Sequence, residues 1–228
     1  MKELVEFSEE HIEFYRRFYK DKSFSSRELN SFDDLAKIPI LTKQDLQGVK
    51  LEDRVAEGCK VITTNTGGTS GQPMSIYLDN EAYAREWAHM HNIWERLDYR
   101  ITDAKLTLRG ADLGDEPIKY NLVHNEFQVN AYSDLTELLL ALRSVLNKYK
   151  IRYVHGYPSS IYELIKVLSG NDSALLGLLK KNLKGVFFGS EFPAKVYRNF
   201  IEEQLQVPTI SWYGHSEMAV LAPEDKGQ

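Results

Sequence analysis

Cysteine is nearly absent from this sequence: Cys59 is the only one among 228 residues. A single thiol excludes an internal disulfide framework and a cluster of thiolate metal ligands. We expect Cys59 to be a buried structural thiol.

Long apolar runs and a surplus of basic residues are absent as well. No stretch approaches the roughly 20 apolar residues of a transmembrane helix, and the charged N-terminal segment does not resemble a signal peptide. These absences favour a cytoplasmic protein without a membrane span. With 28 Lys and Arg against 33 Asp and Glu, the net charge is −5. Such a chain has no basic surface for nucleic acid, and an acidic substrate would require a locally positive site.

The residues that are present fit a globular protein. Hydrophobic residues make up 43% of the chain and charged residues 27%, which are ordinary values. A chain of this length buries enough surface to form a core without disulfides. It fits one large domain or two small ones.

Hydrophobic periodicity predicts an α/β fold. Strands are expected at residues 61–64, 74–78, 105–108, 151–154, 184–188 and 209–212. Helices are expected at residues 3–20, 31–37, 43 onward, 81–97, 134–146, 159–168, 173–181 and 194–205. From residue 134 on, strands and helices alternate with short links, which indicates a parallel βαβαβ sheet with right-handed crossovers. The polar stretch 109–132 is expected to be mostly loop.

Local signals refine some of these elements. Thr42 with Asp45, and Asp134 with Glu137, have the spacing of helix N-caps. The long helix after residue 80 carries apolar residues at helical spacing, which predicts a buried stripe. Its members are Tyr83, Trp87, Met90, Trp94 and Leu97.

Polar segments follow three of the predicted parallel strands. They read HGYPSS from His155, FGSEFP from Phe188 and YGHSEM from Tyr213. In such sheets ligands bind beyond the carboxyl ends of the strands, so the segments predict a shared crevice. Glycine, proline and serine also make ordinary turns and caps, and that alternative stays open. Arg109, just past another strand, is either a cation for a carboxylate or phosphate or an ordinary surface arginine.

A loop rich in glycine and hydroxyl residues, TNTGGTSGQP, separates the first two predicted strands. It lacks the lysine of the P-loop motif, and it enters a strand rather than a helix, which excludes the dinucleotide-binding fingerprint. It is a hairpin-type loop whose backbone N–H groups and hydroxyls can surround an anion. A plain turn is the alternative.

Together, TGGTSGQP and the downstream WYGHSE resemble motifs of the adenylate-forming ligases, which include acyl–coenzyme A synthetases. The segments IPILTKQDL, VHGYPSSIYELIKVL and GSE are similar to the phenylacetate–coenzyme A ligase-like branch and its capsular polysaccharide biosynthesis relatives. The resemblance runs over most of the chain. It implies the N-terminal part of an adenylate-forming ligase fold: a parallel βαβαβ sheet, flanking helices and a hairpin-type phosphate loop.

The resemblance also implies roles for individual residues. A phosphate loop for the β- and γ-phosphates of ATP would comprise Thr66, Gly67, Gly68, Thr69, Ser70 and Gly71. An adenine pocket would be lined by Gly189, Ser190 and Glu191, with Tyr213 stacking on the ring and Gly214 beside it. Ser216 would reach the α-phosphate and Glu217 would coordinate Mg²⁺.

The chain departs from the family pattern at three points. Met74 stands where many relatives have lysine, which removes a cationic phosphate contact, and Ser216 replaces threonine but keeps the hydroxyl. The family continues to a ribose-binding aspartate and a small mobile C-terminal domain, both of which would lie beyond Gln228. We therefore expect residues 1–228 to be the N-terminal part of an adenylation domain. We also expect an unpaired sheet edge that favours self-association, for example as a homodimer.

The function implied is activation of a small carboxylic acid with Mg-ATP, giving an acyl-adenylate and pyrophosphate. Transfer of the acyl group to a thiol such as coenzyme A, an amine or a hydroxyl would follow, and the capsular relatives imply a place in cell-surface polysaccharide biosynthesis. A truncated, non-catalytic nucleotide-binding module and a structural protein that keeps only the fold are the alternatives.

Overall fold

The computed structural model describes residues 1–65 and 74–225, which form two compact units. Unit 1 comprises Met1–Tyr83 and Ser216–Met218, and unit 2 comprises Ala84–His215 and the segment from Ala219 on. Within the described residues, no helix has the length and apolar character needed to cross a bilayer.

Unit 1 begins with short helices around a small aromatic core. They are α1 (Lys2–His11), α2 (Glu13–Asp21), η1 (Ser26–Glu28), η2 (Asp33–Lys37), α3 (Lys43–Leu46) and η3 (Leu51–Arg54). The prediction of one helix over 3–20 is wrong, because Ile12 is extended, with φ −119° and ψ 113°. The break lets Val5 of α1 pack into the same cluster as Phe14 and Phe18 of α2.

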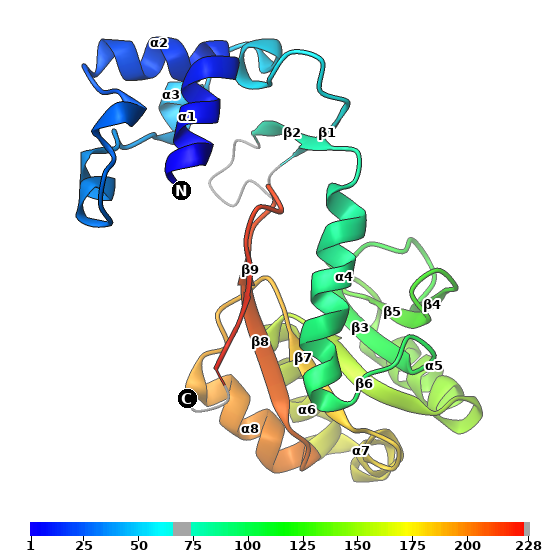
Figure 1. Cartoon of the computed structure of the whole chain (residues 1–228). Coiled ribbons are helices and arrows are strands. Elements are labelled where there is room, and N and C mark those ends of the chain that lie inside the picture. The colour runs from blue at the N-terminus through cyan, green and yellow to red at the C-terminus, as the bar shows by residue number, and fades with distance from the viewer. Residues whose placement is uncertain (66–73, 226–228) are drawn as a thin grey trace. The chain divides into compact units, whose positions relative to one another are not determined.

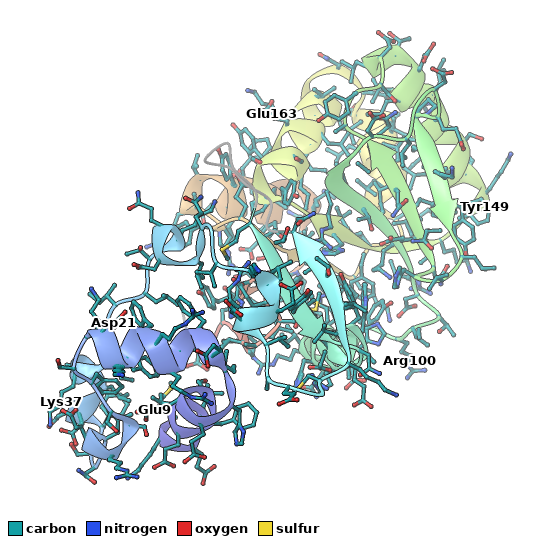
Figure 2. All side chains as sticks on the ribbon, turned by 90° about the horizontal axis from the view of Figure 1, so that it is seen from above. Glu9, Asp21, Lys37, Arg100, Tyr149 and Glu163 are labelled. Atoms are coloured by element: carbon teal, nitrogen blue, oxygen red, sulfur yellow. The ribbon has the colours of Figure 1, made fainter. Side chains whose placement is uncertain are left out.

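Hydrogen bonds from side chains fix the ends of these helices. The predicted cap at Thr42 is confirmed: its hydroxyl accepts from the N–H of Asp45, and the Asp45 carboxylate accepts from the N–H of Thr42. Figure 2 labels Glu9 on α1, whose carboxylate accepts a hydrogen bond of 2.9 Å from the N–H of Ser26 in η1. The N-terminal helices are thus joined by polar contacts as well as by their core.

The predicted hairpin follows in unit 1. Strands β1 (Val61–Asn65) and β2 (Ser75–Asp79) pair antiparallel from Val61↔Asp79 to Asn65↔Ser75. Met74 and Met218 pack against the buried residues Ile76, Leu78 and Ala82. The prediction that Cys59 is buried is wrong: the residue is exposed, because it follows the turn at Gly58 before the hairpin begins.

Unit 2 is built on a seven-stranded sheet of order β4-β5-β3-β6-β7-β8-β9. Its strands are β3 (Ala104–Ala111), β4 (Ile118–Asn121), β5 (Glu126–Asn130), β6 (Ile151–Gly156), β7 (Gly185–Phe188), β8 (Thr209–Gly214) and β9 (Leu221–Pro223). The run β5-β3-β6-β7-β8 is parallel, which confirms the predicted parallel sheet, and β4 and β9 are antiparallel. Within the described residues, the outer edge of β9 has no partner strand, so the expected self-association stays a prediction.

The prediction that residues 109–132 are mostly loop is wrong. This stretch contains the end of β3 and all of β4 and β5. Its glycine and asparagine residues mark tight turns, with positive φ at Gly114 and Asn125, while Phe127 and Val129 of β5 are buried. The polar residues that connect these short strands obscure their alternating pattern in the sequence.

Helices cover both faces of this sheet (Figure 1). On one face lie α4 (Ala82–Trp94) and η4 (Glu95–Leu97), with Trp94 fully buried against Tyr153 and Phe187. The other face carries α5 (Leu135–Lys148), α6 (Pro158–Asn171), α7 (Ser173–Lys180) and α8 (Lys195–Leu205). The predicted cap of α5 is confirmed, because Asp134 accepts from the N–H groups of Thr136 and Glu137 at 2.8 and 3.2 Å. In the predicted stripe of α4, Tyr83 is 44% exposed and only the later residues pack inward.

Candidate functional site

Of the three polar segments predicted to form a crevice, the third ends in unit 1 with Ser216–Met218. The first two and the start of the third lie at one edge of the sheet of unit 2. They follow β6, β7 and β8, which are parallel neighbours, so their carboxyl ends meet at the same side. We call this side, where β3 also ends, the carboxyl edge.

Gly156 allows the backbones of β3 and β6 to approach closely at this edge. A Cβ atom at this position would lie 2.1 Å from the carbonyl oxygen of Leu108, so only glycine fits. The N–H of Tyr157 donates to that same Leu108 oxygen at 3.0 Å, and the N–H of Gly189 donates to the Gly156 oxygen at 3.1 Å. Backbone hydrogen bonds therefore join the end of β3, the loop after β6 and the loop after β7.

The loop after β7 is held by two further contacts. The carboxylate of Glu191 accepts a hydrogen bond of 2.9 Å from the N–H of Ser159, in the first turn of α6. The Ser190 hydroxyl accepts one of 3.3 Å from Arg109 at the end of β3. Ser190 has a φ of +63°, a region that costs a non-glycine residue about 1 kcal/mol or more. The contacts on either side help to hold this conformation.

One face of the carboxyl edge gathers Arg109, His155, Gly189 and Trp212. Thr107 pairs with His155, His155 with Phe187, and Phe187 with Ile210. Residues two positions further along a strand face the same way. These four residues therefore share the face that α4 covers.

His155 is the least satisfied polar group of this region. It is 2% exposed, and neither ring nitrogen has a hydrogen-bond partner among the residues that the structure describes. Burial holds the pKa of this imidazole well below its usual range, and the charges of Arg109 and Lys105 lower it further. A Cβ atom at Gly189 would lie 3.4 Å from His155 Nε2 and 3.0 Å from the Trp212 ring. The imidazole is thus neutral and reaches close to the Gly189 backbone.

Tyr213 and Gly214 end β8 at the same edge. The Tyr213 side chain is 67% exposed, which leaves its ring accessible for stacking. Gly214 allows close packing of β9, since a Cβ atom there would lie 2.9 Å from Cδ1 of Leu221. Unit 2 therefore brings together the residues expected for an adenine pocket: Gly189, Ser190, Glu191, Tyr213 and Gly214.

The other predicted site residues belong to unit 1. The loop residues Thr66, Gly67, Gly68, Thr69, Ser70 and Gly71 lie outside the described residues. The base of their hairpin is closed by the pair Asn65↔Ser75, with a hydrogen bond of 2.7 Å from the Ser75 hydroxyl to Asn65 Oδ1. Ser216 and Glu217 are exposed, and Met218 after them packs into the cluster of β2. The final motif and the predicted phosphate hairpin thus share one unit.

The donor set fits the Mg²⁺ that the resemblance implies. Among the described residues, no three His, Cys, Asp or Glu side chains gather as a metal cage. Mg²⁺ commonly takes one or two carboxylates together with substrate phosphates and waters. An exposed carboxylate such as Glu217 suits that mode of binding.

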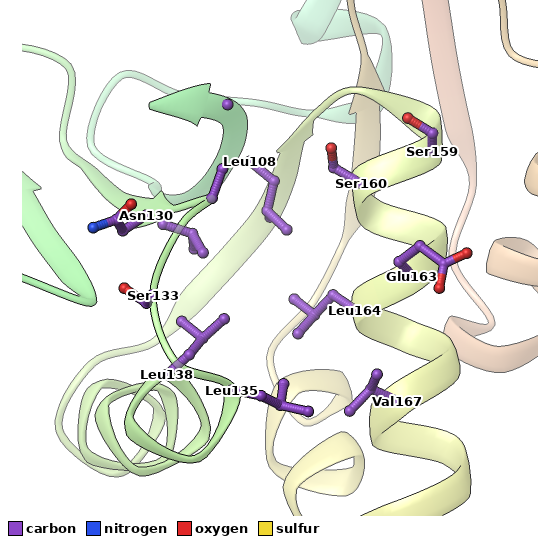
Figure 3. Close-up of a pocket in the computed structure, with 13 residues that line it drawn as sticks. Leu108, Asn130, Ser133, Leu135, Leu138, Ser159, Ser160, Glu163, Leu164 and Val167 are labelled. Atoms are coloured by element: carbon purple, nitrogen blue, oxygen red, sulfur yellow. The ribbon is translucent and has the colours of Figure 1, made fainter. Parts of the chain in front are cut away.

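A separate cavity of about 400 Å³ lies on the face of the sheet that α5 and α6 cover (Figure 3). Its wall is largely apolar, with Leu108, Leu138 and Leu164 pointing inward, while the Glu163 carboxylate points away. Neither this cavity nor the unsatisfied imidazole was predicted from the sequence. The cavity is lined from four separate elements, whereas the histidine in the apolar strand IRYVHG was a signal that could have been used.

No family model matches this sequence. Over 98% of its length the chain is similar to Protein CapK of Staphylococcus aureus, with 23% identity over 234 residues that make up 50% of CapK. This is a distant homology. The chain spans about half the length of this curated relative.

Solved structures share the fold. An open conformation of 2-hydroxyisobutyryl-CoA ligase, in complex with 2-HIB-AMP and CoA, aligns with a TM-score of 0.69 and 20% identity over 98% of this chain and 54% of that one. A malonyl-CoA ligase ternary product complex with methylmalonyl-CoA and AMP aligns with a TM-score of 0.50 and 18% identity over 81% of this chain and 41% of that one. The resemblance to the adenylate-forming ligases is thus confirmed as an α/β fold that matches about half of a ligase chain.

Proposed function

We propose that this chain is the nucleotide-binding part of an enzyme that activates a carboxylic acid with ATP. The observation that carries the proposal is the packing of Met218 into the cluster of β2. This contact links the Ser216-Glu217 pair to the hairpin whose loop is proposed to hold phosphate. Two motifs separated by over 130 residues in the sequence then bind the same ligand.

The proposed roles follow the two units. The hairpin loop from Thr66 to Gly71 holds the β- and γ-phosphates through backbone N–H groups and hydroxyls. The Ser216 hydroxyl donates to the α-phosphate. In unit 2, Gly189, Ser190 and Glu191 line the adenine pocket, and Tyr213 and Gly214 cover the ring.

The chemistry is substitution at the α-phosphorus. A carboxylate oxygen of the acid attacks this phosphorus, the bond to the oxygen that bridges the α- and β-phosphates breaks, and pyrophosphate leaves with that electron pair. Glu217 would hold Mg²⁺ together with the phosphates, and the ion would supply charge neutralisation. The residues of the chain contribute positioning and hydrogen bonds to the developing charge.

The acyl group then passes to an acceptor. A thiol such as coenzyme A is supported by the solved ligase complexes, one of which contains 2-HIB-AMP and CoA. The similarity to CapK favours a place in capsular or cell-surface polysaccharide biosynthesis, with an amine or hydroxyl as further acceptors.

The test is hydroxamate formation from Mg-ATP, hydroxylamine and a panel of small carboxylic acids, using the natural polypeptide that carries this sequence. We expect Glu217→Gln to lower the rate at least 100-fold, because an amide binds Mg²⁺ far more weakly than a carboxylate. Glu57→Gln, an exposed change in unit 1, is the control and should leave the rate unchanged. Equal rates for the two variants would refute the proposal.

A second candidate is a nucleotide-binding module without catalysis. The packing of Met74 in an apolar cluster favours this candidate. Many relatives have a phosphate-binding lysine at this position, whereas here the side chain packs against apolar residues. This candidate predicts that AMP and Mg-ATP bind without pyrophosphate release, whatever acid is supplied.

A further inference from the structure

Arg109 places an uncompensated positive charge at the carboxyl edge. Its side chain is exposed, and its hydrogen bond to the Ser190 hydroxyl is long, at 3.3 Å. Over residues 1–65 and 74–225, no carboxylate forms an ion pair with this guanidinium. The nearest acidic residue in that loop, Glu191, directs its carboxylate to the N–H of Ser159 instead. Most donors of the planar guanidinium therefore remain available.

His155 is an independent sign of an incomplete polar site on the same face. It is 2% exposed, and within residues 1–65 and 74–225 neither ring nitrogen has a hydrogen-bond partner, which is rare for a buried polar group. Its Nε2 lies 3.4 Å from the position of a Cβ atom at Gly189. Buried polar atoms without partners that face a ligand site are commonly completed by the ligand or by a water that the ligand orders.

The chemistry of these groups selects an anion. Burial keeps His155 neutral, and the ammonium of Lys105, four residues before Arg109 on β3, is bound by Tyr99 and His124. The cation at the carboxyl edge itself is therefore Arg109. Ser190 accepts the hydrogen bond of Arg109, and its own O–H is free to donate. A guanidinium, a hydroxyl and a neutral imidazole together match an oxyanion, which the guanidinium can bind through two parallel hydrogen bonds.

We propose that Arg109, together with the Ser190 hydroxyl, binds an oxyanion of the ligand at the carboxyl edge. This inference rests on the proposed function. The oxyanion is either the phosphate of the nucleotide or a carboxylate that the acid carries in addition to its reacting one, since each presents two oxygens that a guanidinium can bind with two hydrogen bonds. In the second case the substrate is a small dicarboxylic acid.

The experiment measures binding to the 228-residue chain by calorimetry and NMR, with adenosine, AMP and, at saturating AMP, succinate as probes. The variants are Arg109→Gln and Arg109→Lys. Arg152→Gln is the matched control, because Arg152 lies on β6 away from the carboxyl edge. Thermal melting of each variant confirms that the fold is kept.

If Arg109 contacts the phosphate, Arg109→Gln weakens AMP binding at least tenfold and changes adenosine binding less than twofold. Arg109→Lys then restores part of the AMP affinity. A carboxylate contact predicts unchanged AMP binding and a loss of the succinate response. If the wild-type chain binds AMP and Arg109→Gln changes the affinity for neither AMP nor succinate, the Arg109 site is refuted while the nucleotide site stands. If wild-type chain binds neither adenosine nor AMP, the proposed function fails and the Arg109 site fails with it.

Discussion

The carboxylate of Glu191 and the backbone N–H of Ser159 are 2.9 Å apart, across a hydrogen bond that joins the loop after β7 to the first turn of α6. The carboxylate thereby satisfies one of the N–H groups that have no partner within the helix, and it complements the positive end of the helix dipole. The proposed adenine-binding loop is thus fixed by a contact between residues 32 positions apart.

This contact gives the first prediction. Glu191→Ala should lower the free energy of unfolding by about 1 kcal/mol and weaken AMP binding, because the loop that carries Ser190 loses its attachment to α6. Glu191→Gln keeps an acceptor oxygen and should lie close to wild type in both measurements. Urea denaturation and AMP titration of the two variants check this. Equal losses would show that the negative charge, and not the hydrogen bond, matters.

The strands at this edge could be predicted from the sequence, but the contacts between them could not. Apolar runs such as those ending at Val154 and Phe188 identify buried strands, and their alternation with helices gives the parallel order. Arg109 and Ser190, by contrast, are 81 residues apart and meet only because β3, β6 and β7 lie side by side. No local pattern contains that information.

The two wrong secondary-structure predictions, for residues 3–20 and 109–132, also have physical causes. Residues 3–20 have a continuous helical pattern, and only the packing of Val5 with Phe14 shows why the helix breaks at Ile12. The strand β5 was missed because its sequence, EFQVN, alternates over too few residues between polar turns. Its buried Phe127 packs into a core contributed mainly by later segments of the chain.

Gly156 provides a second prediction, on stability. A Cβ atom there would overlap the backbone of Leu108, 2.1 Å from its oxygen and 2.7 Å from its carbonyl carbon, so β3 and β6 would have to separate. Gly156→Ala should cost more than about 3 kcal/mol, as expected for severe overlap in a core.

Gly170 is the matched control, because it lies in α6 with nothing within 4 Å of its Cβ position. Gly170→Ala should stabilise the protein by up to about 1 kcal/mol. Both values come from urea denaturation monitored by circular dichroism. A Gly156→Ala protein as stable as wild type would contradict the close approach of β3 and β6.

Lys105 gives a prediction on pH. Lys105 is 1% exposed, and its ammonium donates to the Tyr99 hydroxyl at 3.0 Å and the His124 carbonyl at 2.6 Å. Burial lowers the pKa of Lys105 to about 8, whereas an unfolded lysine has a pKa of about 10.4. Between these values the unfolded state binds more protons, so this group makes the folded state more stable as pH rises.

Burial acts in the opposite direction on two tyrosines, raising the pKa of Tyr99 and of Tyr153 to about 12. Above about pH 10 the unfolded state therefore loses protons first and stability falls. The free energy of unfolding should pass through a maximum near pH 10. In Lys105→Met the rise from pH 8 to 10, worth up to about 3 kcal/mol, should disappear while the fall remains. Denaturation curves at fixed ionic strength check this, and a rise of equal size in the variant would contradict the assignment to Lys105.

Met74 provides the most direct test of whether the loop of residues 66–71 is the phosphate site, which both proposed functions require. Its side chain packs beside Ile76, Leu78 and Ala82, immediately before β2. A lysine there keeps an aliphatic stem for the cluster and can extend its ammonium group to the surface. If the loop of residues 66–71 holds phosphate, Met74→Lys should strengthen Mg-ATP binding about tenfold, since a charged hydrogen bond contributes about 1.5–3 kcal/mol. Adenosine binding should not change.

Met74→Gln, of similar length and without charge, is the control for the loss of the thioether. Calorimetric titration with Mg-ATP and adenosine distinguishes the cases. A gain for lysine over glutamine, specific to the triphosphate, places an anion beside residue 74 and supports the loop as the phosphate site. Equal Mg-ATP affinities for the two variants would show that the loop does not bind the phosphates. At low ionic strength, a new cation at the end of the loop would attract a triphosphate bound there.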